Sequence, residues 1–193
     1  MKYELKKRAE RQQQTRQRIV EAAVELHTEL GPAATSISAI ADRAGVQRHT
    51  VYSHFPTELD LGMACSGLHF EREPPPDPEL LAVIEDGEER LRAGLEALYA
   101  YFERNEQILT HVQRDAEVHE TTRIVSGRRF GPFAVRLHEV LAAGLPARGR
   151  RRARRDAALG VATSFQTWRT LARQGGLSTP DAAGVAASMV LGV

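Results

Sequence analysis

The feature that most limits the possible folds of this chain is Gly45, which separates two short segments of helical periodicity. The segment before Gly45 carries apolar residues at the spacing of one helical face, namely Ile37, Ile40, Ala41 and Ala44. Thr35 or Ser36 stands where a hydroxyl oxygen accepts from the first free amides of a helix. Gly45 is suited to end that helix with a positive φ, and Val46 follows as the apolar residue of a tight turn.

A second short helix is predicted directly after this turn. Val51, Tyr52 and Phe55 form its inward side. Its outward side consists of hydrogen-bonding side chains without an acid, namely Gln47, Arg48, His49, Thr50 and His54. This arrangement predicts a helix-turn-helix whose second helix faces base edges. The competing interpretation is an ordinary pair of core helices with a polar outer face.

These residues resemble the DNA-binding motif of the tetracycline-repressor (TetR) family. The resemblance is carried by Thr35-Ser36-Ile37, Ile40-Ala41, Ala44-Gly45-Val46, Thr50-Val51-Tyr52, His54-Phe55 and Leu61. It extends upstream through a helix from Gln14 to Leu30 and the stop at Gly31-Pro32. It implies an all-α fold, in which an N-terminal three-helix head with the helix-turn-helix precedes a helical ligand-binding and dimerisation domain.

Three positions depart from the family pattern. His49 stands where the family usually has Gly, Gln47 where it often has Ser, and Glu58 where it usually has Lys. A lysine at position 58 would contact phosphate, so Glu58 removes a favourable charge there. The side chain of His49 occupies a place where the backbone normally approaches the groove closely. Weaker or differently docked DNA binding is therefore expected.

Eleven residues are predicted to contact DNA. Arg48 and Thr50 are expected to reach base edges. The remaining contacts are assigned to the head and to a basic arm, and they are Thr35, Ser36, Gln47, His49, Tyr52, His54, Lys6, Lys7 and Arg8. The arm is predicted because residues 1–18 carry seven bases against two acids, and such charges release counterions from DNA. The alternative for the arm is a solvated tail without a partner.

The rest of the composition places few demands on the chain. A length of 193 residues buries a substantial core without a metal or disulfide, and the single Cys65 is interpreted as a small buried residue. No apolar run reaches the roughly 20 residues that span a bilayer, so a cytoplasmic protein is predicted. No cofactor is expected. The sequence lacks four common catalytic or cofactor motifs: the nucleophile elbow, the phosphate loop, the zinc-protease helix and the dinucleotide fingerprint. Catalysis is therefore not expected.

The chain is predicted to divide at the proline run of residues 74–76, because consecutive prolines cannot lie inside a helix. The expected parts are a basic flexible arm (1–13), the helix-turn-helix domain (14–56), a connecting helix (57–73) and a helical ligand-binding and dimerisation domain (77–193). In that domain a long amphipathic helix from Asp77-Pro78 to Phe102 is predicted. Gly87 and Gly94 within it indicate close approach of a neighbour or a ligand, with ordinary packing as the alternative. The arginine-rich run of residues 148–155 is interpreted as a solvated loop, and the alternative is binding of nucleic acid or an acidic surface.

The second domain contains a candidate pocket and a candidate dimer interface. The predicted pocket residues are Tyr99, Phe102, His111, Phe130, Phe133, Phe165 and Gln166, and the expected occupant is an apolar or aromatic small molecule. Their competing interpretation is core packing. The predicted interface residues are Trp168, Ala182, Val185 and Met189, which the resemblance implies meet a twofold mate in a four-helix contact. The alternative is a monomer in which this helix pair closes the core.

His111, Asp115 and His119 lie on one face if their segment is helical, which is a pattern that metal ligands share. Three ligands on one helix need other helices to complete the coordination sphere, so no metal is predicted. The expected function is a homodimeric DNA-binding transcriptional repressor, released from double-stranded operator DNA by a small-molecule ligand. The alternative is a helical interaction protein with a weakened DNA-binding head.

Overall fold

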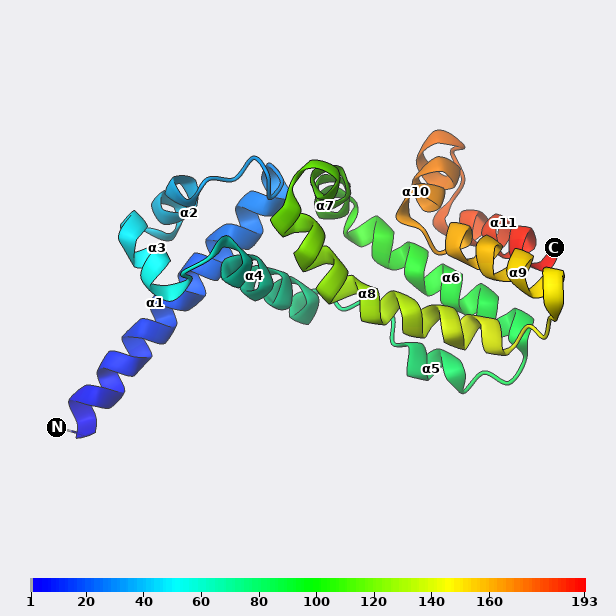
Figure 1. Ribbon diagram of the computed structural model, residues 1–193, viewed down its shortest axis with the longest axis horizontal. Helices are drawn as coiled ribbons and strands as arrows, with labels where there is room; N and C mark the ends of the chain where they lie inside the picture. Colours follow the sequence, from blue (N-terminus) through cyan, green and yellow to red (C-terminus); the bar gives the residue numbers. More distant parts are fainter. Residues whose placement is uncertain (1) are drawn as a thin grey trace. The chain divides into compact units, whose positions relative to one another are not determined.

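The computed structural model describes residues 2–193, except for the side chains of Lys2 and Leu5. These residues form helices joined by loops, as Figure 1 shows, and residues 2–193 contain no β-strand. The predicted all-α fold is confirmed. The chain forms two compact units, and each unit is built from two separate stretches of sequence.

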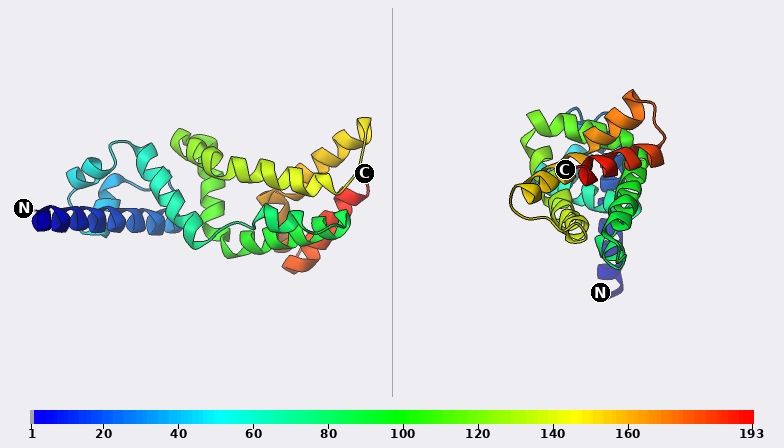
Figure 2. Two further views of the ribbon diagram at one scale, coloured as in Figure 1. Left: turned by 90° about the horizontal axis from the view of Figure 1, so that it is seen from below. Right: turned by 90° about the vertical axis from the view of Figure 1, so that its right-hand side faces the viewer.

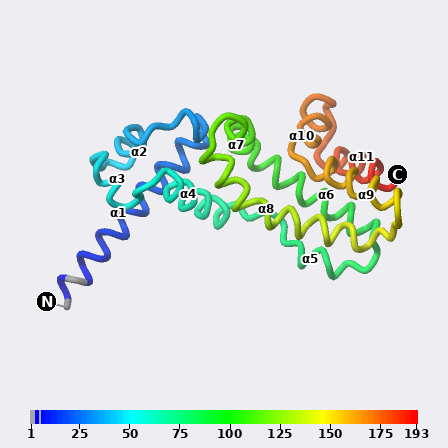
Figure 3. The backbone as a smooth tube through the Cα atoms, in the orientation of Figure 1, coloured from blue at the N-terminus to red at the C-terminus, as the bar shows by residue number. Residues whose placement is uncertain are grey.

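The first unit, which we call the head unit, contains the chain up to Arg72 together with Gln107–Arg129. Its helices are α1 (Lys2–Glu29), α2 (Ile37–Ala44), α3 (Arg48–His54), α4 (Glu58–Arg72), most of α7 (Glu106–Val118) and the first part of α8 (Glu120–Ala143). Helices α2 and α4 pack on α1, and α3 packs on α2. Figure 3 shows the path of the backbone from α1 to α3 in blue and cyan.

One apolar core holds the head unit together. It contains Ile19, Val20, Ala22, Ala23, Leu26, Ile40, Ala41, Ala44, Val51, Phe55, Leu61 and Cys65. The stripe predicted on α1 is therefore buried, apart from Leu30, which lies beyond the end of the helix and is exposed. Because Leu61 and Cys65 of α4 belong to this core, α4 is part of the head unit, whereas the sequence suggested a separate connecting helix over residues 57–73.

Helix α1 begins much earlier than the sequence analysis expected. Residues 1–13 were predicted as a flexible arm, but α1 is continuous from Lys2 to Glu29. The segment lacks Gly and Pro and is rich in Lys, Arg, Glu and Gln, all of which extend an existing helix at little cost. Its described side chains from Tyr3 to Gln14 are exposed, so this part of α1 is supported by propensity rather than by packing.

The second unit, which we call the C-terminal unit, contains Glu73–Glu106 and Phe130–Val193. Its helices are α5 (Pro78–Ala82), α6 (Gly87–Arg104), the second part of α8, α9 (Gly149–Ala162), α10 (Phe165–Trp168), which continues as a π-helical stretch over Arg169–Gln174, and α11 (Thr179–Leu191). Helix α11 packs along α6 and beside α9, as the red, green and orange-yellow ribbons of Figure 2 show. Alanines on the inner face of α11 allow this close contact.

Two glycines in α6 confirm the predicted close approach. A Cβ atom on Gly87 would overlap the backbone of Gly144 at the end of α8. A Cβ on Gly94 would lie 2.6 Å from a methyl carbon of Leu141. The N-terminal end of α6 and the C-terminal end of α8 therefore meet backbone to backbone, which only glycine permits.

Several helix boundaries differ from the predicted ones. The long helix expected from Asp77 to Phe102 is broken between α5 and α6, where the Asp86 carboxylate accepts from the Glu89 amide at 2.8 Å and caps α6. The arginine-rich run expected to be a loop is mostly helical, because α9 begins at Gly149. Arginine is a strong helix former, so charge alone did not indicate a loop.

Candidate nucleic-acid interface

The turn between α2 and α3 has the geometry that its sequence predicts. Ser36, rather than Thr35, is the cap of α2, and its hydroxyl oxygen accepts from the Ala39 amide at 3.1 Å. Gly45 adopts a left-handed conformation with φ 64°, and the Val46 amide donates back to the Ala41 carbonyl at 2.9 Å. These bonds satisfy the last carbonyls of α2 and direct the chain into α3.

Helix α3 presents a polar face and buries an apolar one. Val51 and Phe55 are buried in the head-unit core. The exposed residues of the opposite face are Gln47, Arg48, His49, Tyr52 and Ser53, while Thr50 and His54 are half-buried. The sequence analysis placed Tyr52 among the inward residues, and this was wrong, since its side chain is 43% exposed. α3 and its cap contain no acidic residue, so the face suits an anionic partner.

Arg48 and Tyr52 form one structural pair on this face. The Arg48 guanidinium donates from Nη2 to the Tyr52 hydroxyl at 3.2 Å, and its Cζ lies 5.6 Å from the centroid of the tyrosine ring. A cation over an aromatic face is attracted by the ring quadrupole. The pair therefore orients a guanidinium on the outer side of α3, where a planar donor group can contact guanine or phosphate.

The two hydroxyl residues before α2 differ in what they can donate. The Thr35 hydroxyl donates to the Gly31 carbonyl at 2.8 Å, so its single proton is already used within the loop. The Ser36 hydroxyl accepts from an amide, which leaves its own proton for an outside acceptor. Ser36 is therefore the better phosphate donor of the two, and Thr35 mainly orders the loop.

Two arginines of α1 lie beside the helix-turn-helix and were missed by the sequence analysis. The Arg16 guanidinium carbon lies 4.7 Å from the Phe55 ring centroid. The Arg18 guanidinium lies 3.9 Å from the place that a Cβ on Gly45 would occupy. In the sequence they stand three residues and one residue before Ile19, the first residue of the buried stripe, and this spacing alone does not show that both face the motif. The predicted DNA contacts of the arm are Lys6, Lys7 and Arg8. They are exposed and lie nearer the N-terminal end of α1.

Not every basic residue of the head unit is available to a partner. Arg43 of α2 is paired with Glu25 at 3.1 Å and with Glu29 at 2.9 Å, and both acids belong to α1. Hydrogen bonding from Arg43 lowers the pKa of Glu29. This triad neutralises the guanidinium and fastens α2 to α1, so Arg43 serves the fold.

Glu58, the residue that stands where the family usually has Lys, has partners inside the head unit. Its Oε1 lies 3.1 Å from His119 Nε2, and its Oε2 accepts from the Thr121 hydroxyl at 3.3 Å. Thr57 and Asp60 form a capping box at the same point, where each side chain bonds the other residue's amide. The Glu58 carboxylate is thus directed toward the start of α8, which the sequence alone did not indicate.

The half-buried His27 contacts the buried Cys65 in the head unit. The His27 Nδ1 atom lies 3.4 Å from the Cys65 sulfur. Burial lowers the pKa of His27 to about 4, against a raising influence of Asp115. Burial also raises the pKa of the Cys65 thiol to about 12, so this cysteine is a neutral core residue, as its sequence context suggested.

Two of the three residues considered as a metal constellation, Asp115 and His119, have other partners. Asp115 accepts from the Ala33 amide, and His119 contacts Glu58 and Thr122. Among residues 2–193, no group of three or more His, Cys, Asp and Glu side chains could hold a metal ion. Within the same residues, every helix is too short or too polar to span a lipid bilayer.

Three of the predicted pocket residues lie in the core of the C-terminal unit. Tyr99, Phe102 and Phe165 are at most 4% exposed, and the rings of Phe102 and Phe165 lie 5.5 Å apart in an edge contact. The Tyr99 hydroxyl donates to the Ala162 carbonyl at 2.8 Å, and burial raises its pKa. These three rings therefore fill the core, as the competing interpretation held.

The other pocket residues are dispersed. Phe130 and Phe133 form a half-buried pair on α8, with ring centroids 4.9 Å apart. Gln166 is exposed, and His111 belongs to the head unit rather than to the C-terminal unit. Helical spacing correctly predicted that Tyr99, Phe102 and Phe165 are buried. It did not show which residues of different helices lie close together in the fold.

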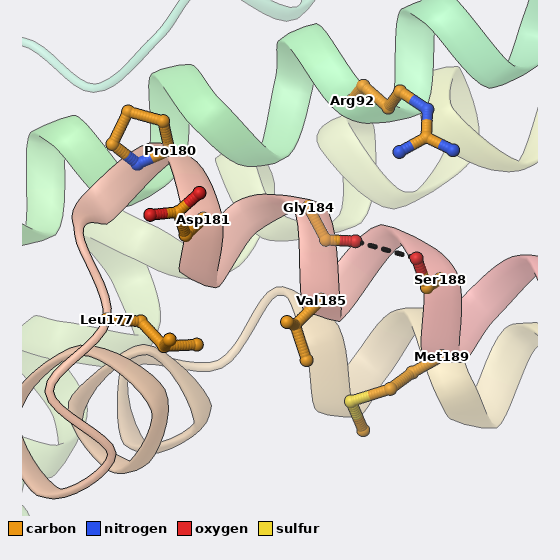
Figure 4. Close-up of a pocket in the computed structure, with 8 residues that line it drawn as sticks. All are labelled: Arg92, Leu177, Pro180, Asp181, Gly184, Val185, Ser188 and Met189. Atoms are coloured by element: carbon orange, nitrogen blue, oxygen red, sulfur yellow. Dashed lines mark hydrogen bonds between the residues drawn. The ribbon is translucent and has the colours of Figure 1, made fainter.

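The predicted dimer residues divide into two kinds. Trp168 and Ala182 are 0% exposed within the chain, so they offer no surface to a partner and we remove them from the interface. Val185 and Met189 are 41% and 43% exposed on the outer face of α11. They line an open groove of about 800 Å³, shown in Figure 4, with Arg92, Leu177, Pro180, Asp181, Gly184 and Ser188.

The fold and the α2–α3 geometry define a helix-turn-helix protein. Residues 19–61 match the model of the family described as bacterial regulatory proteins, tetR family. The match lies in the head unit and covers the helix-turn-helix together with parts of α1 and α4. The HTH-type transcriptional activator FasR of Mycolicibacterium smegmatis is 34% identical over 86 residues, which make up 45% of this chain. That match spans 39% of the length of FasR.

Solved structures resemble the chain along nearly its whole length. A TetR family transcriptional regulator, PfmR from Thermus thermophilus, has a TM-score of 0.60 and 20% identity, with 90% of this chain and 97% of PfmR covered. AibR, solved in complex with isovaleryl coenzyme A and operator DNA, has a TM-score of 0.63 and 18% identity, with 91% and 97% covered. At these identities the likeness establishes a shared fold.

Proposed function

We propose that this chain is a transcriptional regulator that binds double-stranded operator DNA through the outer face of α3. The observation that carries the proposal is the acid-free exposed face on which Tyr52 holds the Arg48 guanidinium. Arg48 contacts base edges, while Ser36 and the α1 arginines Arg16 and Arg18 contact phosphate. Gln47, His49, Thr50 and His54 complete the face toward the groove.

The regulator acts as a homodimer in the cytoplasm, where bacterial DNA is found. The support for a dimer is the outer face of α11, where the small residues Gly184 and Ser188 alternate with the exposed Val185 and Met189. Small residues at four-residue spacing let two helices approach closely. A twofold dimer would place two α3 helices on half-sites about one helical turn, roughly 34 Å, apart.

The regulator represses transcription and leaves its operator when an apolar or aromatic small molecule binds the C-terminal unit. AibR, whose structure contains isovaleryl coenzyme A and operator DNA, supports a small-molecule ligand with an apolar acyl part. Two buried polar atoms, the Tyr101 hydroxyl and the Trp168 indole nitrogen, have no hydrogen-bond partner within residues 2–193. A polar group on the ligand would satisfy such an atom, which is costly to leave unpaired.

Activation is the second candidate for the sign of regulation, because FasR, a relative that matches 45% of this chain, is an activator. A reporter gene behind the bound promoter separates the two, since a repressor lowers expression and an activator raises it. The test of DNA binding itself is a selection from random duplexes with the wild-type protein. Enrichment of a palindromic sequence supports the proposal, and recovery of no preferred sequence favours the interaction-protein alternative.

The dimer and the ligand have separate tests. Val185→Glu should yield a monomer by sedimentation, because a charge buried in an apolar interface is strongly unfavourable, while Glu117→Gln on the exposed side of α7 should remain dimeric. Candidate ligands come from a thermal-shift screen of hydrophobic compounds. Binding energies are reciprocal, so operator DNA must weaken the ligand by the factor by which the ligand weakens operator binding. Equal ligand affinity with and without operator would contradict induction.

A further inference from the structure

A buried carboxylate outside the α3 face holds the loop that leads into α2. Asp115 is 2% exposed, and its Oδ2 atom accepts from the Ala33 amide at 3.0 Å. Its Oδ1 atom accepts from the Arg114 side chain at 2.7 Å. Arg114 in turn donates to the Leu30 carbonyl at 3.1 Å. We call Arg114 and Asp115 the clasp, because together they bond both sides of the loop between α1 and α2.

The loop is shaped to receive this clasp. Gly31 has φ 96°, a conformation that side chains rarely adopt. A Cβ atom at this position would lie 2.5 Å from both the Arg114 guanidinium and the Asp115 carboxylate. The glycine therefore permits the close approach of α7, and the two elements fit one another at atomic contact.

Hydrogen bonds connect the clasp to the residues at the start of α2. The Thr35 hydroxyl donates to the Gly31 carbonyl at 2.8 Å, and the Thr35 amide donates to the Pro32 carbonyl at 3.2 Å. Ser36 follows at once and caps α2. A displacement of the loop at Ala33 would thus move the Ser36 hydroxyl and the first amides of α2.

The burial and the hydrogen bonds of Asp115 indicate that it fixes the position of its neighbours. Burial raises the pKa of Asp115, but hydrogen bonds from Arg114 and the Ala33 amide outweigh it and keep the pKa below its usual value. A buried carboxylate contributes little to stability compared with an apolar residue of the same size. It does, however, fix the position of the groups that bond to it.

We propose that Asp115 is a positioning residue for DNA binding, which fixes the loop of residues 30–36 so that Ser36 and the start of α2 meet the phosphate backbone. This inference rests on the proposed DNA binding. Asp115 touches no DNA itself. It acts through Ala33 and Gly31, and Arg114 supports it from the edge of the loop.

The first test compares Asp115→Asn with the matched control Glu117→Gln, an exposed carboxylate on the same helix. The asparagine keeps an acceptor for the Ala33 amide but loses the charge that Arg114 binds. We expect the operator affinity of the folded variant to fall roughly tenfold, because a charge-assisted hydrogen bond is lost. The loss should be the same on every duplex, because the substitution removes no contact to a base. The Ala33 amide should exchange faster with solvent. The control should match the wild type in both measurements.

A double-mutant cycle separates positioning from a merely structural role. If Asp115 acts through the start of α2, Asp115→Asn should cost much less affinity in a Ser36→Ala background than in the wild type. In a Lys7→Ala background, Asp115→Asn should lower the affinity as much as in the wild type, because Lys7 lies near the N-terminal end of α1. Additive effects in both backgrounds would overturn the inference. Arg114→Gln, which removes an exposed partner of the loop, should give a smaller loss of the same kind if Asp115→Asn does not fold.

The result also distinguishes this inference from the proposed function. If the wild-type protein selects no duplex, DNA binding fails and the positioning role fails with it. If the wild type binds and Asp115→Asn binds equally well, the positioning role alone is wrong and the DNA-binding proposal stands.

Discussion

The head unit and the C-terminal unit are both built from helices, but they place their large polar and aromatic side chains in opposite ways. The head unit turns Arg48, His49 and Tyr52 outward on a short helix, and a local hydrogen bond joins Arg48 to Tyr52. The C-terminal unit turns Tyr99, Phe102 and Trp168 inward, where they pack against one another. The comparison teaches that a surface site can be contained in one contiguous motif, whereas aromatic residues at helical spacing first serve the core.

The largest effect that would sharpen this comparison is expected at Trp168, the only tryptophan and a fully buried residue. Trp168→Ala should lower the free energy of unfolding by about 3 to 5 kcal/mol, because it removes a large apolar side chain and leaves a cavity. Urea unfolding followed by far-ultraviolet circular dichroism measures the change. Gln166→Ala, an exposed neighbour, should stay within about 0.5 kcal/mol of the wild type. A similar small change for Trp168→Ala would contradict a packed aromatic core.

The second prediction concerns acid sensitivity in the head unit. The pKa of His27 is about 4 in the folded state, below its usual value of 6.5, so the unfolded state binds the proton first as pH falls. Above pH 6.5 the protonation of His27 does not change the free energy of unfolding. As pH falls from 6.5 to about 4, protonation of His27 in the unfolded state lowers the free energy of unfolding by about 3 kcal/mol in total. His27→Gln should flatten this dependence, as amide hydrogen exchange in α1 across that range can measure. An unchanged pH profile in the variant would mean that His27 is not the responsible group.

The smallest effect is expected at the tyrosine that orients Arg48. Tyr52→Phe removes the hydroxyl that accepts from Arg48 but keeps the ring beneath the guanidinium. Operator binding should weaken by about 1 kcal/mol or less, because one exposed hydrogen bond is lost. Fluorescence anisotropy with the selected duplex measures it, with Ser53→Ala as the neighbouring control. A loss as large as that of Arg48→Ala would show that Tyr52 itself contacts DNA.

Much of the head unit could be predicted from sequence, because its signals are local. Gly45 and Ser36 act on residues within one turn of themselves, so their roles followed from spacing. The burial of Ile19 to Leu26 likewise followed from a single helical stripe. The same reasoning misjudged Tyr52, since periodicity over a helix of seven residues does not separate its inner and outer faces sharply.

The parts that sequence did not reveal depend on contacts between distant residues. The bond between Asp115 and Ala33 joins positions 82 residues apart, and the Glu58 contacts join positions 61 and 63 apart. Nothing in the spacing of His111, Asp115 and His119 indicates that their segment packs on the loop before α2. The candidate pocket stays a prediction for the same reason, because helical spacing shows which residues are buried and not which of them surround a space.

The central claim is that the outer face of α3 reads DNA sequence, and Arg48 tests it most directly. The measurement is a duplex selection carried out in parallel with wild-type protein and Arg48→Ala, followed by affinity measurements on the enriched sequence and on its single-base variants. We predict that Arg48→Ala loses about 1 to 3 kcal/mol on the preferred duplex and tolerates substitution at one base pair of each half-site. Arg43→Ala, which removes an arginine already paired with Glu25 and Glu29, should keep the wild-type preference. Unchanged affinity and unchanged preference in Arg48→Ala would contradict the account.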